Sequence, residues 1–466
     1  MNDSSLARGR ALATCVMTML ACGGDGVTRP ADDTILPRPD IEDTREPDIV
    51  TATLVVSAAE ALPGKRVAVR LDDPTTVSGT VTLDGVDVRF HRGRALLTTT
   101  PEAAPAAWGI TTRAFDEATD LRIDGELTVA AGETRTIAAG TRVLLGPNAS
   151  IVVAGTLTVA GTAAQPVLFT ADDSAWAAIE VRGGHLELDE TWLVGGGADR
   201  DRFAGHSSSD PVIAATDGEV HIHGGGIVDA VGKALYTERS VVELDGVTIA
   251  RCDTGGEHVD SHVTMRDSWV FEIPDADGVF GDDDNDGIYL RLGSHTIEHT
   301  VFAMGEDDGI DQNGADVTIH DVWIEGMHHE GIATSNGGRV SISGVVVRDA
   351  NQGIEVGYGA PVVDVSDSLV TACGVGLRWG DEYDWEALGT LSVTRTVALQ
   401  NTVDVETEDP QQGQAPVGAV QITCSAVGDA EAQSDGGNIR DVAPWVGLCP
   451  PPLSACEQPI GAEQCR

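Results

Sequence analysis

The side chains best suited to chemistry gather in one acidic stretch of this 466-residue chain, from position 282 to position 330. The stretch contains the carboxylates of Asp308, Asp311 and Glu330 together with the imidazole of His329. Carboxylates that stand beside a histidine share protons readily and suit general acid–base catalysis. These four residues are therefore the candidate catalytic groups, although an Asp that precedes Gly can also simply serve a turn.

A second pattern in the same stretch has the spacing of a metal-binding loop. Asp282, Asp284 and Asp286 form D-x-D-x-D-G, in which alternating carboxylates can point at one hard cation, as in the first half of a calcium loop. The twelfth position, where an EF-hand requires Glu, is Gly293, so the pattern is not an EF-hand. We expect calcium here, with Asp308 as a further ligand. The alternative is a solvated acidic loop.

The element that must position these side chains is a strand repeat. A Gly-Ile pair recurs every 22 residues, at Gly287, Gly309, Gly331 and Gly353. Between the pairs, apolar and polar residues alternate, as in VTIHDVWI at 317–324, which is typical of strands with one buried face. A fixed period of this length indicates a solenoid. We predict an all-β, right-handed parallel β-helix of about 22-residue coils, stacked at roughly 4.8 Å with the Ile columns inside.

The first coils carry a pattern seen in a known family. The chain has AGT at 139–141, GTL at 155–157 and QPV at 165–167. In these residues it resembles the right-handed parallel β-helix proteins of bacterial surfaces, the pectate-lyase-like superfamily. The resemblance covers roughly residues 119–408 and implies the fold. It does not imply one function, because this fold hosts lyases, hydrolases, epimerases and adhesins.

The polar residues that precede the Gly-Ile pairs form a ladder along the stacked coils. This ladder is partly similar to that of the polygalacturonase hydrolases, which carry N-T-D, D-D, G-H-G and R-I-K on successive coils. Here ND, DD and HE precede three successive Gly-Ile pairs, and the next coil has GIE instead of R-I-K. Without that basic pair the resemblance does not extend to uronic acid binding. Asp311 in GIDQN is faintly similar to the GIDPH of alginate epimerases, but the Pro-His is absent. An elimination of the pectate-lyase type would need calcium and a basic residue, and the sequence does not indicate which basic residue would have this role.

The charge of the chain excludes two classes of partner. Its formal net charge is −45, and Lys65 and Lys233 are its two lysines. Such a surface repels nucleic acid and anionic lipid, and it attracts divalent cations. We therefore expect no nucleic acid partner, and a membrane contact through a lipid anchor alone. The charge can also serve solubility without any specific ligand.

The N-terminus has the features of an export signal. Arg8 and Arg10 precede the apolar segment ALATCVMTMLA, which is too short to span a bilayer and leads to Cys22. Residues 1–22 resemble a bacterial lipoprotein signal, which implies lipidation of Cys22 and a location at the outer membrane or cell surface. An ordinary signal peptide is the alternative. Residues 23–47 have the Pro, Gly and Asp content of a disordered tether.

The remaining segments flank the repeat. Residues 48–118 contain short alternating runs separated by turns, which predict a small β-sandwich-like domain or an irregular β cap. Residues 409–466 lose the repeat and contain four cysteines, so we expect a C-terminal cap that an exported chain can close with two disulfides of unspecified pairing. Cys252 and Cys373 lie too many coils apart to bond to each other.

Two functions follow from these features. The first is an exported, lipid-anchored cell-surface β-helix protein that interacts with a polysaccharide or cell-surface glycan and holds structural calcium. The second is a polysaccharide-active enzyme, a lyase, hydrolase or epimerase, that uses Asp308, Asp311, His329 and Glu330. The missing R-I-K motif favours the first function, and the concentration of Asp and His on adjacent coils favours the second.

Overall fold

The computed structural model describes most of the chain after residue 119 and short parts before it. The described residues are 56–62, 66–71, 79–83, 86–97, 120–171, 174–198, 205–207, 209–273, 284–380, 386–409, 413–428, 437–440, 442–445 and 449–465. Cys22 and the expected signal and tether segments lie outside these residues. Among the described residues, no helix is long and apolar enough to cross a membrane.

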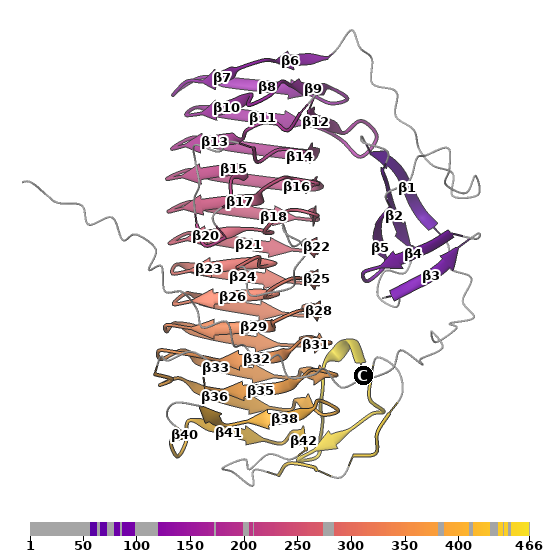
Figure 1. The fold of residues 1–466 in the computed structure, drawn as a ribbon, viewed down its shortest axis with the longest axis vertical. Helices are drawn as coiled ribbons and strands as arrows, with labels where there is room; N and C mark the ends of the chain where they lie inside the picture. Colours follow the sequence, from indigo (N-terminus) through magenta and orange to yellow (C-terminus); the bar gives the residue numbers. More distant parts are fainter. Residues whose placement is uncertain are drawn as a thin grey trace, which may run out of the picture. The chain divides into compact units, whose positions relative to one another are not determined.

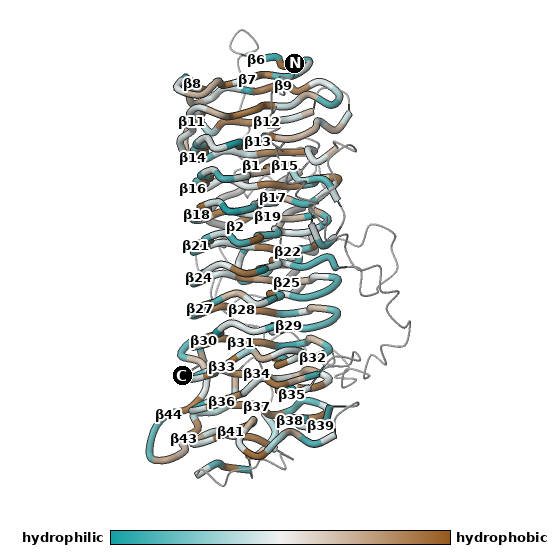
Figure 2. Tube along the Cα trace, turned by 90° about the vertical axis from the view of Figure 1, so that its left-hand side faces the viewer, coloured by the Kyte–Doolittle hydropathy of each residue, from teal (hydrophilic) through white to brown (hydrophobic). Residues whose placement is uncertain are grey.

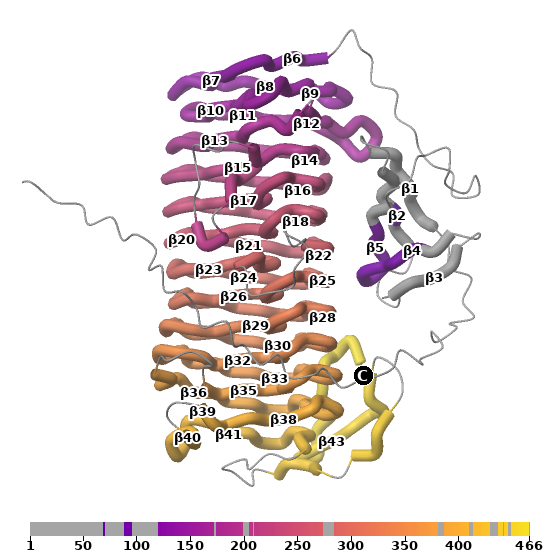
Figure 3. Tube along the Cα trace, in the orientation of Figure 1, coloured from indigo at the N-terminus to yellow at the C-terminus, as the bar shows by residue number. Residues whose placement is uncertain are grey.

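Each 22-residue repeat is one coil of three short strands. One coil contains β23 (Ile288–Arg291), β24 (Ser294–Glu298) and β25 (Val301–Gly305). The next contains β26 (Ile310–Asn313), β27 (Asp316–His320) and β28 (Trp323–Met327). Every strand pairs in parallel with the equivalent strand of the next coil, so that Ile288 lies beside Ile310 and Ile297 beside Ile319. Figures 1 and 3 show the coils stacked in sequence order. The predicted parallel β-helix is confirmed.

One strand of each coil contributes to a 12-stranded sheet, which lies along one face of the β-helix. Its strands are β7 (Glu126–Val129), β10 (Ser150–Val153), β13 (Ile179–Arg182), β15 (Pro211–Thr216), β17 (Lys233–Glu238), β20 (Glu257–Val259), β23, β26 (Ile310–Asn313), β29 (Glu330–Ser335), β32 (Gln352–Val356), β35 (Val375–Trp379) and β38 (Val403–Glu406).

The rest of each coil belongs to a 23-stranded sheet that covers the remaining faces, as two strands in most coils and as one long strand in the coils of β14 and β16. Its strands are β6 (Leu121–Ile123), β8 (Thr134–Ala138), β9 (Arg142–Leu145), β11 (Thr156–Ala160), β12 (Val167–Ala171), β14 (His185–Val194), β16 (Glu219–Val228), β18 (Val241–Asp245), β19 (Thr248–Ala250), β21 (His262–Arg266), β22 (Trp269–Ile273), β24, β25, β27 (Asp316–His320), β28 (Trp323–Met327), β30 (Arg339–Ser343), β31 (Val346–Arg348), β33 (Val362–Ser366), β34 (Leu369–Thr371), β36 (Thr390–Thr394), β37 (Val397–Ala398), β41 (Val420–Thr423) and β42 (Ala426–Val427).

The core is a set of apolar columns that run through the coils. Ile310 is fully buried and lies between Ile288 and Ile332 in the stacking order, as the repeat predicts. The columns belong to one continuous cluster of buried side chains from Ile123 to Val427. Figure 2 shows the apolar strand segments of each coil alternating with polar turns. Because each coil covers its neighbours, the core forms only when several coils stack.

A short antiparallel β domain precedes the β-helix and contacts it. The domain consists of β1 (Val56–Leu62), β2 (Arg66–Leu71) and β5 (Arg94–Leu97) in one sheet and of β3 (Gly79–Leu83) and β4 (Val86–Phe90) in another. The turn between β4 and β5 reaches the 23-stranded sheet. The guanidinium of Arg94 lies 3.6 Å from the ring centroid of Trp269, and that of Arg92 lies 4.1 Å from Trp323.

The C-terminal segment closes the last coils. Parallel pairing continues through β41 and β42 to Val427, beyond the expected end of the repeat at 408. Disulfides join Cys424 to Cys456 and Cys449 to Cys465, whereas Cys252 and Cys373 are buried and form no disulfide. The remaining elements are β39 (Glu408–Asp409), β40 (Gly413–Gln414), β43 (Ser454–Ala455), β44 (Gln458–Pro459) and the 3-10 helix η3 (Glu463–Cys465).

Candidate functional site

The predicted polar ladder forms at the start of the 12-stranded sheet's strands. Asp308 immediately precedes the Gly-Ile pair of one coil, and Glu330 begins β29 in the next coil. The backbone N–H of Glu330 donates to Asp308 Oδ1 at 2.8 Å. The Gln352 amide on β32 donates to Glu330 Oε1 and accepts from the guanidinium of Arg378. Each coil therefore adds one polar side chain to a connected hydrogen-bonded column.

His329 lies at the centre of this column. Its Nδ1 is 3.2 Å from Asp307 Oδ1 and 3.6 Å from Asp308 Oδ1, and it also contacts Glu330 Oε2. The His329 side chain is 13% exposed, whereas those of Asp307, Asp308 and Glu330 are 4–8% exposed. The column thus places three nearly buried carboxylates around one imidazole that retains access to solvent.

Burial and mutual contacts shift the pKa values of these groups. Burial raises the pKa of Glu330 to about 7, although the pairing with His329 opposes this shift. Burial and the nearby Glu330 raise the pKa of Asp308 well above its ordinary value. Burial disfavours the imidazolium of His329, but Glu330 and the two aspartates outweigh it and raise its pKa well above the usual range. The cluster can therefore hold and exchange protons near neutral pH.

A second cluster lies beside the first. One ring nitrogen of His206 and one carboxylate oxygen each of Asp286 and Asp311 lie within 4.8 Å of one another. Asp286 is 1% exposed, and its Oδ2 has no hydrogen-bond partner. Burial, then the neighbouring aspartates, raise the pKa of Asp286 well above its ordinary value. His206 Nδ1 also lies 3.2 Å from Asp284 Oδ1.

His206 reaches this cluster because its segment folds against β20 (Figure 3). Glu257 accepts hydrogen bonds from the backbone N–H groups of His206 at 2.8 Å and Ser207 at 2.7 Å. Its Oε1 also lies 2.6 Å from the Nζ of Lys233, which is fully buried. The sequence offered no sign of this contact, because residues 197–210 interrupt the repeat and contain no recognisable motif.

The structure divides the predicted residues between these two clusters. Asp308, His329 and Glu330 belong to one cluster with Asp307, whereas Asp311 belongs to the other with Asp286 and His206. The expected calcium ligands are divided in the same way, since Asp284 and Asp286 lie at the His206 cluster and Asp308 at the other. Asp282 lies outside the described residues.

Several half-buried or exposed polar and aromatic side chains lie on the 12-stranded sheet or in the turns that directly follow its strands. Asn313 Nδ2 donates to the hydroxyl of Tyr358 at 2.9 Å, and Asn336 donates to Asn313 Oδ1 at 3.2 Å. We call this set the polar row. Its members are Tyr236, Arg291, Asn313, Asn336 and Tyr358.

Tyr289 lies on the outer side of β23 and is nonetheless buried. It alternates with the core residues Ile288 and Leu290, so it points away from the core. Even so, it is only 5% exposed, because the ring of His206 stacks on it at 4.3 Å. The segment 205–207, whose position the sequence did not indicate, therefore makes Tyr289 part of a packed site.

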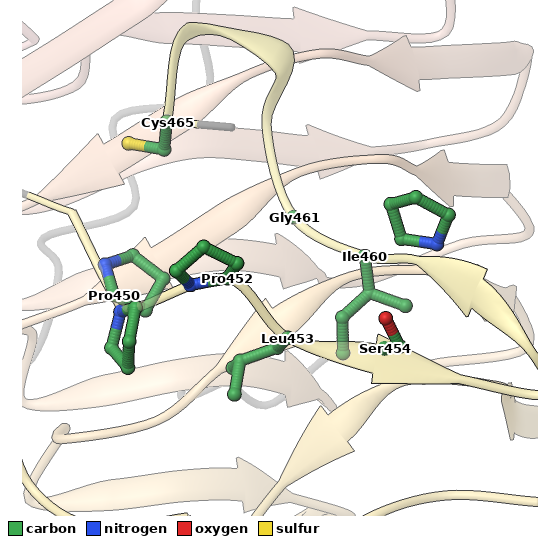
Figure 4. A pocket seen from close by; sticks show the side chains of 9 residues that line it. Pro450, Pro452, Leu453, Ser454, Ile460, Gly461 and Cys465 are labelled. Carbon is green, nitrogen blue, oxygen red and sulfur yellow. The ribbon is translucent and has the colours of Figure 1, made fainter.

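Two further features are less suited to a site for chemistry. A histidine-rich group on the 23-stranded sheet contains His185, Glu219 and His221, with His223 and Glu243 adjoining, and its members are half-buried or exposed. A pocket in the C-terminal segment is lined by prolines, Leu453 and Ile460 (Figure 4). Because that lining holds no titratable side chain apart from disulfide-bonded Cys465, the pocket offers no acid–base chemistry.

Comparison with known proteins gives no close relative. No family model and no curated protein sequence matches the chain. An alginate lyase from Paenibacillus sp. str. FPU-7 is 13% identical, with a TM-score of 0.28 over 64% of this chain and 99% of its own. A PL6 family polysaccharide lyase from Pseudopedobacter saltans is 13% identical, with a TM-score of 0.27 over 73% and 99%. These likenesses are too distant to carry an argument, so the fold assignment rests on the strand pairing of this chain.

Proposed function

We propose that this protein is an exported, lipid-anchored β-helix protein that binds an extended glycan along its 12-stranded sheet. The polar row carries this proposal. Sugars present hydroxyl groups that pair with amides and guanidinium groups, and flat C–H faces that pack on tyrosine rings. Arg291, Asn313, Asn336 and Tyr358 come from four successive coils, on or directly after β23, β26, β29 and β32. Because parallel strands repeat at about 4.8 Å, this part of the row presents such groups at regular steps to a polymer of repeating units.

The charge of the chain narrows the class of glycan. A formal net charge of −45 repels a polyanionic chain at long range. A neutral polysaccharide avoids this repulsion, and a uronic acid polymer would need a bridging divalent cation. We therefore propose a neutral polysaccharide or cell-surface glycan as the ligand.

Glycan binding is tested by titrating the purified protein with a panel of neutral and acidic polysaccharides. Asn313→Ala removes the amide at the centre of the polar row and should weaken binding of the best ligand about tenfold, the loss of roughly one hydrogen bond. Thr318→Ala is the matched control, because Thr318 is exposed on the 23-stranded sheet of the same coil. Equal affinity in both variants would place the glycan elsewhere, and no binding to any polysaccharide would reject the proposal.

The anchor is a separate part of the proposal and rests on the residues that precede Cys22. Cys22→Ser should move the protein from the membrane fraction into detergent-free extracts, because the lipidated thiol is lost. A variant that stays in the membrane fraction would show that another segment holds the protein there.

Catalysis on the bound glycan is the second candidate, and the protonation state of Glu330 favours it. A carboxyl with a pKa of about 7 beside an imidazole is poised to donate and accept protons near neutral pH. Glu330→Gln and His329→Ala should each reduce the release of reducing or unsaturated ends by about 10²–10⁴-fold. Turnover that survives in both variants would exclude this cluster as the catalytic one, and glycan binding without turnover in the wild type would leave the binding function alone.

A further inference from the structure

The His206 cluster has the composition of a metal site, and this idea does not depend on glycan binding. Three side chains from separate parts of the chain meet here: His206 from the segment 205–207, Asp286 before β23, and Asp311 on β26. Asp284 lies 3.2 Å from His206. The cluster therefore offers one imidazole nitrogen and carboxylate oxygens from two aspartates to a single point, with Asp284 beside the histidine.

One atom shows that the protein alone does not complete this site. Asp286 Oδ2 is buried and has no hydrogen-bond partner, although Asp286 is 1% exposed. An unpartnered carboxylate oxygen away from water is costly, and a cation at the centre of the cluster would satisfy it. Ligand atoms about 2.1 Å from a tetrahedral zinc ion lie roughly 3.4 Å from one another, so these atoms, all within 4.8 Å, must move closer together when an ion binds.

The histidine is held in place before any ion binds. Its backbone N–H donates to Glu257, whose carboxylate also contacts the buried ammonium of Lys233. Its ring stacks on Tyr289, with an angle of 7° between the two planes. A side chain at position 205 would overlap the Glu257 carboxylate, so Gly205 permits this approach. Such preorganisation of a ligand is characteristic of a built site rather than of a chance surface contact.

We propose that His206, Asp286 and Asp311, with Asp284 beside them, form a binding site for a divalent transition metal ion such as Zn²⁺. Calcium takes six to eight oxygen ligands, whereas imidazole nitrogen favours zinc and its neighbours in the first transition row. Because His206 is present, we expect a transition metal ion here instead of the calcium that the D-x-D-x-D-G pattern indicates. Lys233 and Glu257 are positioning residues for the histidine.

The test is a calorimetric titration of the full chain, stripped with chelator, with Zn²⁺ and separately with Ca²⁺. The histidine-rich group at His185 and His221 can also take zinc, so the comparison is between variants rather than of absolute stoichiometry. We expect His206→Ala to lose one zinc equivalent, or to weaken that equivalent at least 100-fold, since even losing a hydrogen-bond partner of a ligand costs about 10–100-fold. Asp311→Asn, at a half-buried position, should weaken the same equivalent.

His185→Ala is the matched control, because it removes a histidine from the other group and should leave the equivalent that depends on His206 unchanged. Zinc binding that is identical in the wild type, His206→Ala and Asp311→Asn would overturn the proposal. The proposal would also be overturned if calcium bound more tightly than zinc and its affinity were unchanged in His206→Ala. That result would favour an all-oxygen calcium loop.

Discussion

At the scale of single residues, the buried position of Glu330 links the candidate site to the stability of the fold. Its carboxyl has a pKa near 4.5 when exposed and about 7 in the folded chain, chiefly because of burial. Between these pH values the folded chain keeps a proton that the unfolded chain has released. Stability therefore falls as pH rises from about 4.5 to 7, and the full penalty is present above pH 7.

Glu330→Gln should remove this pH dependence at one position. We expect the difference in unfolding free energy between pH 5 and pH 8 to become smaller by an amount on the order of a few kcal/mol, since the amide does not ionise. The imidazolium of His329 also loses its stabilising effect at high pH, so part of the slope should remain. Urea denaturation in the presence of chelator measures the change. Glu298→Gln on β24 is the control, and an equal slope in both variants would contradict the assignment.

Tyr289 gives a second prediction at this scale. Because the ring is buried under His206, Tyr289→Ala should destabilise the chain by about 2–4 kcal/mol, close to the usual cost of removing a buried aromatic ring. Tyr289→Phe keeps the stacked ring and should cost about 1 kcal/mol or less. Tyr236→Ala, at a half-buried position of the same sheet, is the control. Thermal denaturation that ranks the two alanine variants equally would show that the stacking on His206 contributes nothing.

At the scale of the coil, the glycines of the Gly-Ile pairs are required by close packing. None of Gly287, Gly309, Gly331 and Gly353 has a positive φ, so a left-handed backbone does not explain them. A Cβ at Gly309 would lie 2.6 Å from the carbonyl oxygen of Gly331 in the next coil. The sequence indicated a turn at Gly287, and the structure shows instead that the backbone of the next coil leaves no room for a side chain.

Gly309→Ala should therefore push two coils apart and destabilise the chain by about 1–3 kcal/mol, the usual range for overpacking. Gly125→Ala is the matched control, since a Cβ at Gly125 meets nothing within 4 Å. Urea denaturation of both variants measures the difference. A Gly309→Ala chain as stable as the control would show that the coils can shift to accept a methyl group.

The sequence predicted the coils well and the site only in part, for a physical reason. Stacked coils repeat their contacts, so Ile288, Ile310 and Ile332 occupy equivalent positions and the spacing reveals the core directly. The ladder of Asp308 and Glu330 follows from the same register. His206 enters from a segment outside the repeat, and its position depends on pairing with Glu257, which no spacing encodes. Asp308 and Asp286 belong to different clusters because of the directions of their side chains, and the 22-residue period does not determine those directions.

At the scale of the whole molecule, the excess of acidic residues acts on every coil. The chain has 74 Asp and Glu against 29 Lys and Arg, which gives the net charge of −45. Some arginines pair with aspartates of a neighbouring coil, as Arg239 does with Asp217 and Arg395 with Asp367. Arg239 and Asp217 are largely exposed, and exposed pairs contribute little to stability. Repulsion among the remaining carboxylates should therefore outweigh the attraction within the pairs.

This balance predicts that salt stabilises the fold. Raising NaCl from 0.01 M to 1 M shortens the screening length from about 30 Å to about 3 Å, which weakens long-range repulsion more than contacts at 3 Å. The melting temperature in the presence of chelator should rise by a few degrees. Tetramethylammonium chloride at equal ionic strength is the control, because a bulky cation screens charge without occupying carboxylate sites. A melting temperature that falls with salt would mean that the arginine–aspartate pairs, rather than repulsion, dominate the electrostatic energy of the folded chain.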